Sequence, residues 1–207
     1  MPNETAKQVE QRRASSDVAK ALDEWLAPAP GDSLWHGQHE SVGQIESIIL
    51  PAGWKKEELE RPTGGASMYL KYHPEEQSDT QFAFFYRGQK LNTEESSKFR
   101  NLLQKPAHVL SPAELESIKS VLRDKQNPND FKMLLAKTEE VNSKRVLIVE
   151  GHYKEIAEDN RTIFVDADGT GAAVQEIFFQ APKAQYLRHF KSATSAVRSI
   201  KWKDSLL

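Results

Sequence analysis

Apolar and polar residues alternate over several stretches of the chain, which is the pattern of half-buried β-strands. In the segment 66–73, Met68, Leu70 and Tyr72 fall on one face of such a strand. The segment 41–50 alternates at first and then becomes continuously apolar, which is typical of a strand that enters a core. We therefore predict strands over residues 41–50, 66–73, 81–87, 131–138, 145–156, 161–166 and 173–180.

Other stretches repeat with the helical period. Thr93 with Ser96 predicts a helix start, and Ser111-Pro112-Ala113-Glu114 is a capping box with proline at the first helical position. A C-terminal helix is predicted to begin at Pro182, and the segment 199–202 to close the chain as a short strand or cap. The apolar stripe expected for the helix after Ser111 comprises Leu115, Ile118, Val121 and Leu122, and that of the C-terminal helix comprises Leu187, Phe190, Ala193, Thr194 and Val197.

The order of these segments predicts an α+β fold: a central antiparallel sheet flanked by helices, as an α/β/α sandwich. Residues 166–171 lie between the last two strands, and Gly169 and Gly171 there suit a hairpin turn. A short helix is expected in the N-terminal arm, before the breaker 28–32. The interpretation is an arm with its linker over residues 1–32 and a single α+β domain over 33–207.

The charge balance changes what the domain is expected to bind. With 28 basic and 30 acidic side chains the net charge is −2, which does not favour general binding to nucleic acid or an anionic membrane surface. The longest apolar runs are too short for a membrane span. The first seventeen residues are polar and resemble no signal peptide, so a cytoplasmic location is expected, with export by a signal-less route left open.

No motif for nucleophilic catalysis, phosphate binding or a nucleotide cofactor occurs in the sequence, and the absence of cysteine removes thiol chemistry. The glycine-rich segment 62–67 precedes a strand, so no helix dipole is available there for a phosphate. His36 and His39 lack further zinc ligands nearby. We therefore assign no catalytic residue, no cofactor and no metal, and leave any small-molecule ligand unknown.

Acidic residues near the last hairpin leave one alternative open. Asp166 and Asp168 resemble the start of a calcium loop, but the twelfth position from Asp166 is Ile177 where a glutamate is needed. A hairpin turn is the simpler interpretation. The alternative is a hydrolase that uses a metal or paired carboxylates around the 166–176 hairpin, with Glu176 and with help from His152.

Aromatic residues concentrate in two predicted strands, where consecutive phenylalanines must point to opposite faces of a sheet. Such strands indicate a sheet covered on both sides or a surface for a partner. Arg188 and Lys191 lie on the side of the C-terminal helix expected to be exposed, where they suit an acidic partner or simply a solvated face. The candidate binding residues are Phe82, Phe84, Phe85, Phe178, Phe179, Arg188 and Lys191.

Several landmarks of the chain together resemble the PsbP-like superfamily. They are the opening strand into Leu-Pro-Ala-Gly-Trp at 50–54, Gly-His-Tyr at 151–153, the hairpin to Gln-Glu-Ile-Phe-Phe-Gln-Ala-Pro at 175–182, and the closing Ser-Ile-Lys-Trp at 199–202. That superfamily includes the extrinsic photosystem subunit, DcrB-type proteins, adaptor chaperones of type VI effectors and the Ran-release factor. The resemblance implies a central antiparallel sheet between helices and binding to other proteins, and it implies no catalytic residue. The N-terminal arm, the paired helices over 93–125 and the missing signal peptide depart from the family pattern.

These observations favour a non-enzymatic protein-binding module that acts as an adaptor, chaperone or assembly factor. The hydrolase around the 166–176 hairpin is the first alternative. A further alternative is a secreted bacterial effector or structural partner whose arm folds on binding. The binding module predicts aromatic surface that the helices leave uncovered.

Overall fold

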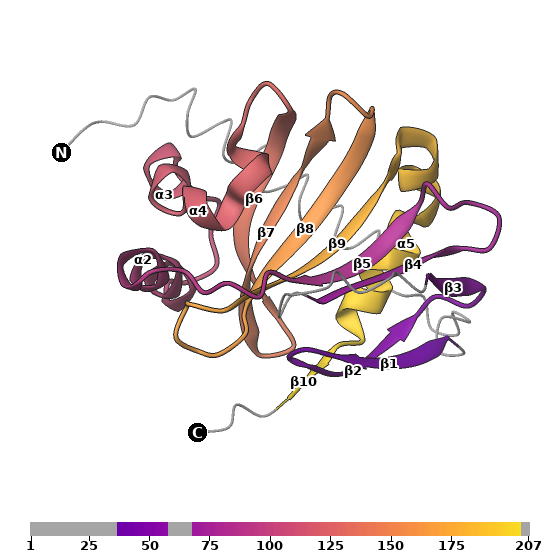
Figure 1. The fold of residues 1–207 in the computed structure, drawn as a ribbon, viewed down its shortest axis with the longest axis horizontal. Coiled ribbons are helices and arrows are strands. Elements are labelled where there is room, and N and C mark those ends of the chain that lie inside the picture. The colour runs from indigo at the N-terminus through magenta and orange to yellow at the C-terminus, as the bar shows by residue number, and fades with distance from the viewer. Residues whose placement is uncertain (1–36, 58–67, 204–207) are drawn as a thin grey trace. The chain divides into compact units, whose positions relative to one another are not determined.

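The computed structural model describes residues 37–57 and 68–203 (Figure 1). The helix expected in the N-terminal arm, His36 and the glycine-rich segment 62–67 lie outside these residues. The domain boundary at residue 32 therefore stays a prediction. Within the described ranges, none of the helices combines the length and the apolar character that a membrane span requires.

Seven strands form one fully antiparallel sheet in the order β3-β4-β5-β9-β8-β7-β6, and a second sheet has the order β1-β2-β10. The predicted α+β class with a central antiparallel sheet is confirmed. The strands are β1 Gln38–Val42, β2 Ile45–Leu50, β3 Trp54–Glu57, β4 Met68–Pro74, β5 Gln81–Tyr86, β6 Phe131–Val141, β7 Lys144–Tyr153, β8 Glu158–Asp166, β9 Val174–Pro182 and β10 Lys201–Trp202. The helices are α2 Thr93–Gln104, α3 Pro112–Ser117, α4 Lys119–Leu122, the 3-10 helix η2 Arg123–Gln126 and α5 Lys183–Arg198.

One predicted strand is a hairpin instead. The segment 41–50 is divided between β1 and β2, because Gly43 adopts a φ of 56° and turns the chain. A Cβ at Gly43 would lie 2.4 Å from the side-chain oxygen of Gln175, so a larger residue would also require the Gln175 side chain to shift. A conformation that glycine adopts without strain therefore turns the chain within a segment that the sequence pattern predicts as one strand.

The helix predicted after Ser111 begins as expected but is broken at Ile118. The capping box forms, since the Ser111 side chain accepts from the backbone N–H of Glu114 and the Glu114 side chain accepts from Ser111. The Ser117 hydroxyl then donates to the Glu114 carbonyl at 2.7 Å, and the Ile118 N–H donates to Leu115 instead. This local competition for a helix carbonyl divides one predicted helix into α3, α4 and η2.

Each face of the large sheet carries its own core. We call one the α5 face: there Ile163, Ile177 and Phe179 pack with α5 and the small sheet. On the opposite face, the α2 face, Leu147 and Phe164 pack under α2, α3 and α4. Figure 1 shows α2, α3 and α4 grouped beside β6 and β7, and α5 near β9 and β5. The helices α2–α4 and helix α5 therefore lie on opposite faces of the sheet, and strands β6 to β9 contribute residues to both cores.

The apolar stripe of α5 differs from the predicted one at Leu187, which is 66% exposed. Tyr186 takes the inward position and stacks on Phe179 with ring centroids 5.0 Å apart. Tyr186, Phe190 and Ala193 follow the i, i+4, i+7 spacing, and one residue further along the helix is turned away by about 100°. Leu187 consequently points to the surface, while Ala193, Thr194 and Val197 are buried as predicted.

Candidate interaction surface

Three aromatic rings form a continuous row on the α2 face, over β4, β5 and β9. Tyr69 is paired with Phe85 across the sheet, and Phe178 is paired with Ala83. The ring centroids of Tyr69 and Phe85 are 6.2 Å apart, as are those of Tyr69 and Phe178. Side chains on alternate residues of a strand share a face, so the register of these strands brings the rings together. We call Tyr69, Phe85 and Phe178 the aromatic row.

The aromatic row belongs to neither core. Its rings are half-buried, and none of them is part of the clusters that pack under α5 or under α2–α4. Burial of the Tyr69 hydroxyl raises its pKa, and the nearby Glu57 carboxylate adds to the effect. The same hydroxyl donates a 3.0 Å hydrogen bond to Gln81. The row is thus supported by its neighbours and keeps partial exposure to solvent.

Arg123 extends the row toward α4. It is exposed, and its guanidinium carbon lies 6.0 Å from the centroid of the Phe85 ring. Its backbone has φ 53° and ψ −119°, a left-handed conformation that glycine favours and that other residues adopt at a cost of about 1–3 kcal/mol. A cation over an aromatic face at this distance is attracted by the ring quadrupole.

A buried ion pair holds α4 next to the row. The Arg87 guanidinium lies 2.8 Å from Glu176, and both side chains are almost inaccessible, with exposures of 8% and 7%. Arg87 also donates to the Ser120 carbonyl at 3.0 Å and to the Val121 carbonyl. Burial lowers the pKa of Arg87, and the Glu176 carboxylate opposes that shift. The end of α4, and with it Arg123, is therefore fixed to the sheet.

Polar side chains border the row along β8 and β9. The Asn160 amide donates to Gln180 at 3.0 Å, and the Gln180 amide donates to Glu158 at 2.6 Å. The Thr162 hydroxyl donates to Asn160 at 2.7 Å. Asn160 and Thr162 are buried, so Gln180 and Glu158 are the members of this chain of hydrogen bonds that reach the surface beside the row. A polar rim around an aromatic centre is typical of protein interfaces.

The predicted binding residues separate into groups. Phe85 and Phe178 come together in the aromatic row. Phe82, Phe84 and Phe179 are buried in the core of the α5 face, with exposures of 1%, 0% and 3%, so their rings are not available to a partner.

The basic pair of the predicted set lies elsewhere. Arg188 is exposed and Lys191 is half-buried, both on α5. Since α5 packs on the opposite face of the sheet, these two residues do not join the aromatic row.

The residues of the hydrolase alternative do not all come together: Asp166 and Glu176 share a face on the neighbouring strands β8 and β9, but His152 lies on the other face. Glu176 pairs with Arg87 on the α2 face, whereas His152 projects from the α5 face and bonds Asp159 at 2.8 Å. The position opposite His152 on β8 is Asp159, seven residues from Asp166, which is about 23 Å along a strand.

Asp168 serves the turn itself. It accepts from the Thr170 hydroxyl at 2.7 Å and from the Thr170 backbone at 3.1 Å, and Lys90 lies 3.3 Å away. These contacts lower the pKa of Asp168 to about 2, although burial opposes the shift. Burial raises the pKa of the neighbouring Asp166. Gly169 and Gly171 adopt φ angles of 73° and 79°, as the predicted hairpin turn requires.

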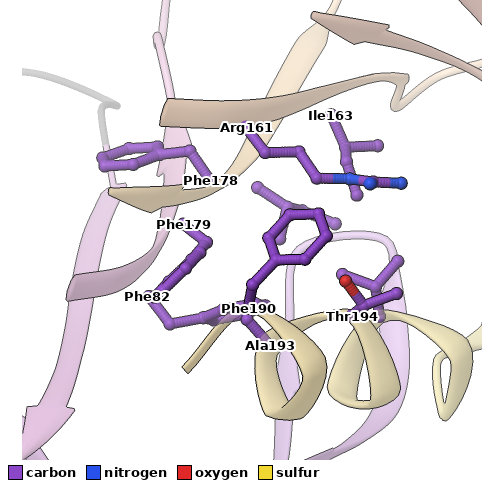
Figure 2. A pocket seen from close by; sticks show the side chains of 10 residues that line it. Phe82, Arg161, Ile163, Phe178, Phe179, Phe190, Ala193 and Thr194 are labelled. Carbon is purple, nitrogen blue, oxygen red and sulfur yellow. The ribbon is translucent and has the colours of Figure 1, made fainter. Parts of the chain in front are cut away.

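A void lies beneath α5 (Figure 2). Its lining includes Phe82, Phe179, Phe190 and Thr194, and its volume is about 10 Å³, which is the room of a single water molecule. Figure 2 also shows Phe178 and Phe179 leaving their strand in opposite directions. The void is too small for a substrate or cofactor.

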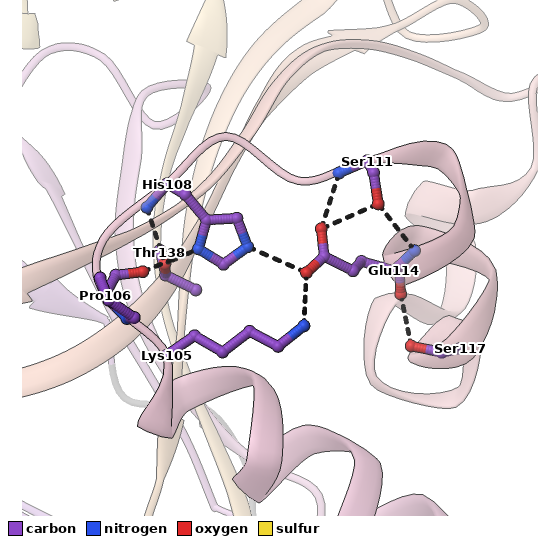
Figure 3. Close-up of polar contacts among 7 residues, drawn as sticks. All are labelled: Lys105, Pro106, His108, Ser111, Glu114, Ser117 and Thr138. Carbon is purple, nitrogen blue, oxygen red and sulfur yellow. Dashed lines mark hydrogen bonds and ion pairs between the residues drawn. The ribbon is translucent and has the colours of Figure 1, made fainter. Parts of the chain in front are cut away.

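A second polar cluster surrounds Glu114 (Figure 3). Its carboxylate accepts from Lys105 at 2.7 Å and from the Ser111 backbone and hydroxyl, both at 2.9 Å, and His108 lies 3.0 Å away. Ser111 bonds the carboxylate and not the imidazole, so the cluster lacks the serine–histidine contact of a nucleophile with its base. It fastens the segment between α2 and α3 to β6, where His108 also bonds Thr138. Within the described part of the chain, no group of three or more potential ligands converges as a metal site would require.

Nothing in the sequence patterns considered above singles out Arg123. Its conformation depends on how α4 ends, and its position over Phe85 depends on the Arg87 contacts. For the aromatic row, the sequence did contain a signal: the alternation in β5 and β9 places Phe85 and Phe178 on the face opposite Phe84 and Phe179.

No protein-family model matches the chain, and no curated protein matches its sequence. Among solved structures, the chain is similar to cyanobacterial PsbP (CyanoP) from Synechocystis sp. PCC 6803, determined in solution. The identity is 10% and the TM-score 0.48, over 86% of this chain and 99% of that one. A PsbP-type protein is thus among the structures that resemble this chain, and no residue or role is transferred from it.

Proposed function

We propose that the protein is a non-enzymatic binding module that presents the aromatic row to a protein partner, as an adaptor, chaperone or assembly factor. The observation that carries the proposal is the position of Tyr69, Phe85 and Phe178: they contact one another on the sheet but belong to neither core.

The composition of this surface supports the proposal. Tyrosine and arginine are enriched among the residues that dominate binding energy, and aromatic residues are enriched at interfaces generally. An antiparallel sheet can leave part of one face uncovered, and among the described residues the core under α2–α4 draws on β6–β8 and Val174, while the row lies over β4, β5 and the middle of β9. Gln180 and Glu158, which are half-buried and hydrogen-bonded to each other, make the adjacent surface polar.

A matched pair of surface variants tests the proposal. The intact protein and a Phe85→Ser/Phe178→Ser variant serve as baits for affinity purification from the native cells, with mass spectrometry of the captured proteins. The control is Leu187→Ser, which removes a 66% exposed apolar side chain from α5, on the other face. We call Phe85→Ser/Phe178→Ser the row variant. We expect the row variant to capture none of the partners that both the intact protein and the control capture.

The row variant must first be shown to keep the fold by circular dichroism and thermal unfolding. If a folded row variant captures the same partners as the intact protein, the row is not the binding surface and the proposal fails.

A further inference from the structure

The conformation of Arg123 is unusual for a surface residue. Its φ of 53° and ψ of −119° place it where glycine is strongly preferred, and strain of this kind concentrates at binding and switch sites. A glycine at this position would end α4 without that strain. A structural role in ending the helix therefore does not account for an arginine side chain here.

The charge of Arg123 has no partner within the part of the chain that the structure describes. The neighbouring cations are matched: Arg87 contacts Glu176 at 2.8 Å, and Lys71 contacts Glu57 at 2.8 Å. The contact recorded for Arg123 is with the Phe85 ring, at 6.0 Å. Arg123 is exposed, so its guanidinium donors face solvent beside the aromatic row.

We infer that Arg123 and the aromatic row together form a site for a peptide segment that carries a carboxylate next to apolar side chains. This inference rests on the proposed function and names the chemistry of the partner. The planar guanidinium donates two parallel hydrogen bonds to a carboxylate, and the rings of Phe85, Tyr69 and Phe178 provide contiguous apolar contact.

The surroundings favour a peptide over a nucleic acid. Glu57 lies close enough to Tyr69 to influence its hydroxyl, Glu158 accepts from Gln180 at the border, and Asp124 follows Arg123 in the chain. These carboxylates repel a run of phosphates, because binding of a phosphate backbone needs several cations. They tolerate a single carboxylate that pairs with Arg123 itself.

The site is held in place before any partner arrives. Arg87 donates to the Ser120 carbonyl at 3.0 Å and to the Val121 carbonyl, next to the last turn of α4. Because Arg87 is itself buried against Glu176, the backbone that carries Arg123 is tied to the sheet. Such preorganisation lowers the entropic cost of binding.

A random peptide library displayed on phage tests the inference. Selections run in parallel on the intact protein, on Arg123→Gly and on the Phe85→Ser/Phe178→Ser variant. We expect peptides selected on the intact protein to be enriched in aspartate or glutamate next to aromatic or aliphatic residues. Synthetic versions of these peptides should bind Arg123→Gly about tenfold more weakly than they bind the intact protein. Added salt should weaken their binding to the intact protein.

Two further variants separate the role of the side chain from that of the backbone. Arg123→Gly should unfold at a higher temperature than the intact protein while binding less well, since glycine relieves the strain. Arg123→Gln keeps the residue size without the charge and should lose the same binding. Arg188→Gln, which changes an exposed arginine on α5, should bind the peptides as the intact protein does.

The outcomes distinguish this inference from the proposed function. Peptides that need the aromatic row but show no acidic enrichment, or that bind Arg123→Gly and Arg123→Gln unchanged, overturn the role of Arg123 and leave the row as a binding surface. If no selected peptide depends on the row, the proposed function and this inference fail together. The inference on Arg123 is supported if the selected peptides bind neither Arg123→Gly nor Arg123→Gln but still bind Arg188→Gln.

Discussion

Phe178 and Phe179 are neighbours in β9 and have opposite surroundings. Phe179 is 3% exposed and contacts Tyr186 of α5 and Trp54, with ring centroids 5.0 and 6.3 Å away. Phe178 is half-buried, and its ring lies next to that of Tyr69, with ring centroids 6.2 Å apart. The difference between the two residues follows from which elements pack over each face of the sheet at this point.

The described residues of β5 and β9 take part unequally in the two cores. On the α5 face, residues of β3 to β9 pack with α5 and the small sheet, among them Phe82, Phe84 and Phe179. On the α2 face, the core under α2–α4 draws on β6, β7, β8 and Val174 of β9. Within the described part of the chain, β5 and β9 thus contribute more residues to the α5-face core than to the α2-face core. A phenylalanine in these strands contributes to the core or to a surface according to its parity in the strand.

The largest expected effect tests this parity directly. Phe179→Ala should lower the free energy of unfolding by about 3–5 kcal/mol, since it leaves a cavity in a closed core. Phe178→Ala should lower it by about 1 kcal/mol, because the ring is open to solvent on one side. Urea denaturation of the two variants measures both values under the same conditions. Equal losses would show that the two faces are equally packed and would remove the comparison.

The buried pair at the margin of the row gives the next largest effect. Arg87→Met leaves the Glu176 carboxylate buried without its cation and should cost about 3 kcal/mol. Arg87→Met/Glu176→Leu should regain much of that loss, since both charges are then removed. A double-mutant cycle in urea measures the coupling between the two residues. A stability of Arg87→Met equal to that of the intact protein would mean that α4 is not held to the sheet by this pair.

A smaller effect is expected where the covered part of the α2 face is fastened. The hydrogen bond from Lys105 is the main cause that holds the pKa of Glu114 well below its usual value of 4.5, with the Ser111 backbone contributing. A carboxyl whose pKa is lower in the folded state stabilises the fold at pH values above its pKa in the unfolded state. This contribution is lost as the pH falls toward and through its pKa in the folded state. Glu114→Ala should therefore cost about 1 kcal/mol at pH 7 and progressively less below about pH 4.5.

Thermal unfolding of Glu114→Ala over the range from neutral to acid pH measures this dependence. Glu116→Ala is the matched control on the same helix, because Glu116 is 73% exposed and pairs with Lys119 at the surface. A deficit of Glu114→Ala that stays constant with pH would contradict the role of its carboxylate. Neither change touches the aromatic row, so binding to the row should be unaffected.

Most of the sheet could be predicted from the sequence because its strands are alternating or continuously apolar segments separated by turn residues. The expected strand over 81–87 is β5, and the meander from β6 to β9 follows the predicted order. Both predicted helix starts are real: the helix expected from Thr93 with Ser96 is capped one residue earlier, by Asn92 with Glu95, and the capping box at Ser111 forms as predicted. These features depend on local chemistry, which a single sequence contains.

Only part of the candidate surface could be predicted from the sequence. Alternation showed that Phe178 and Phe179 must face opposite ways, but not which face the helices would cover, since that depends on contacts between distant segments. Arg123 was missed because its conformation arises where α4 ends, after Ile118 interrupts the helix. Leu187 was misplaced by one position, because Tyr186 gains more by stacking on Phe179.

The smallest expected effect concerns the hydroxyl at the centre of the row. Tyr69→Phe removes the 3.0 Å hydrogen bond to Gln81 and should lower the free energy of unfolding by about 0.5–1 kcal/mol. The ring remains, so apolar contact with Phe85 and Phe178 is kept, and binding of a partner should change much less than in the Phe85→Ser/Phe178→Ser variant. Urea denaturation together with titration of a row-dependent peptide measures both quantities. A loss of binding as large as that of the row variant would mean that the hydroxyl, and not the apolar surface, makes the main contact.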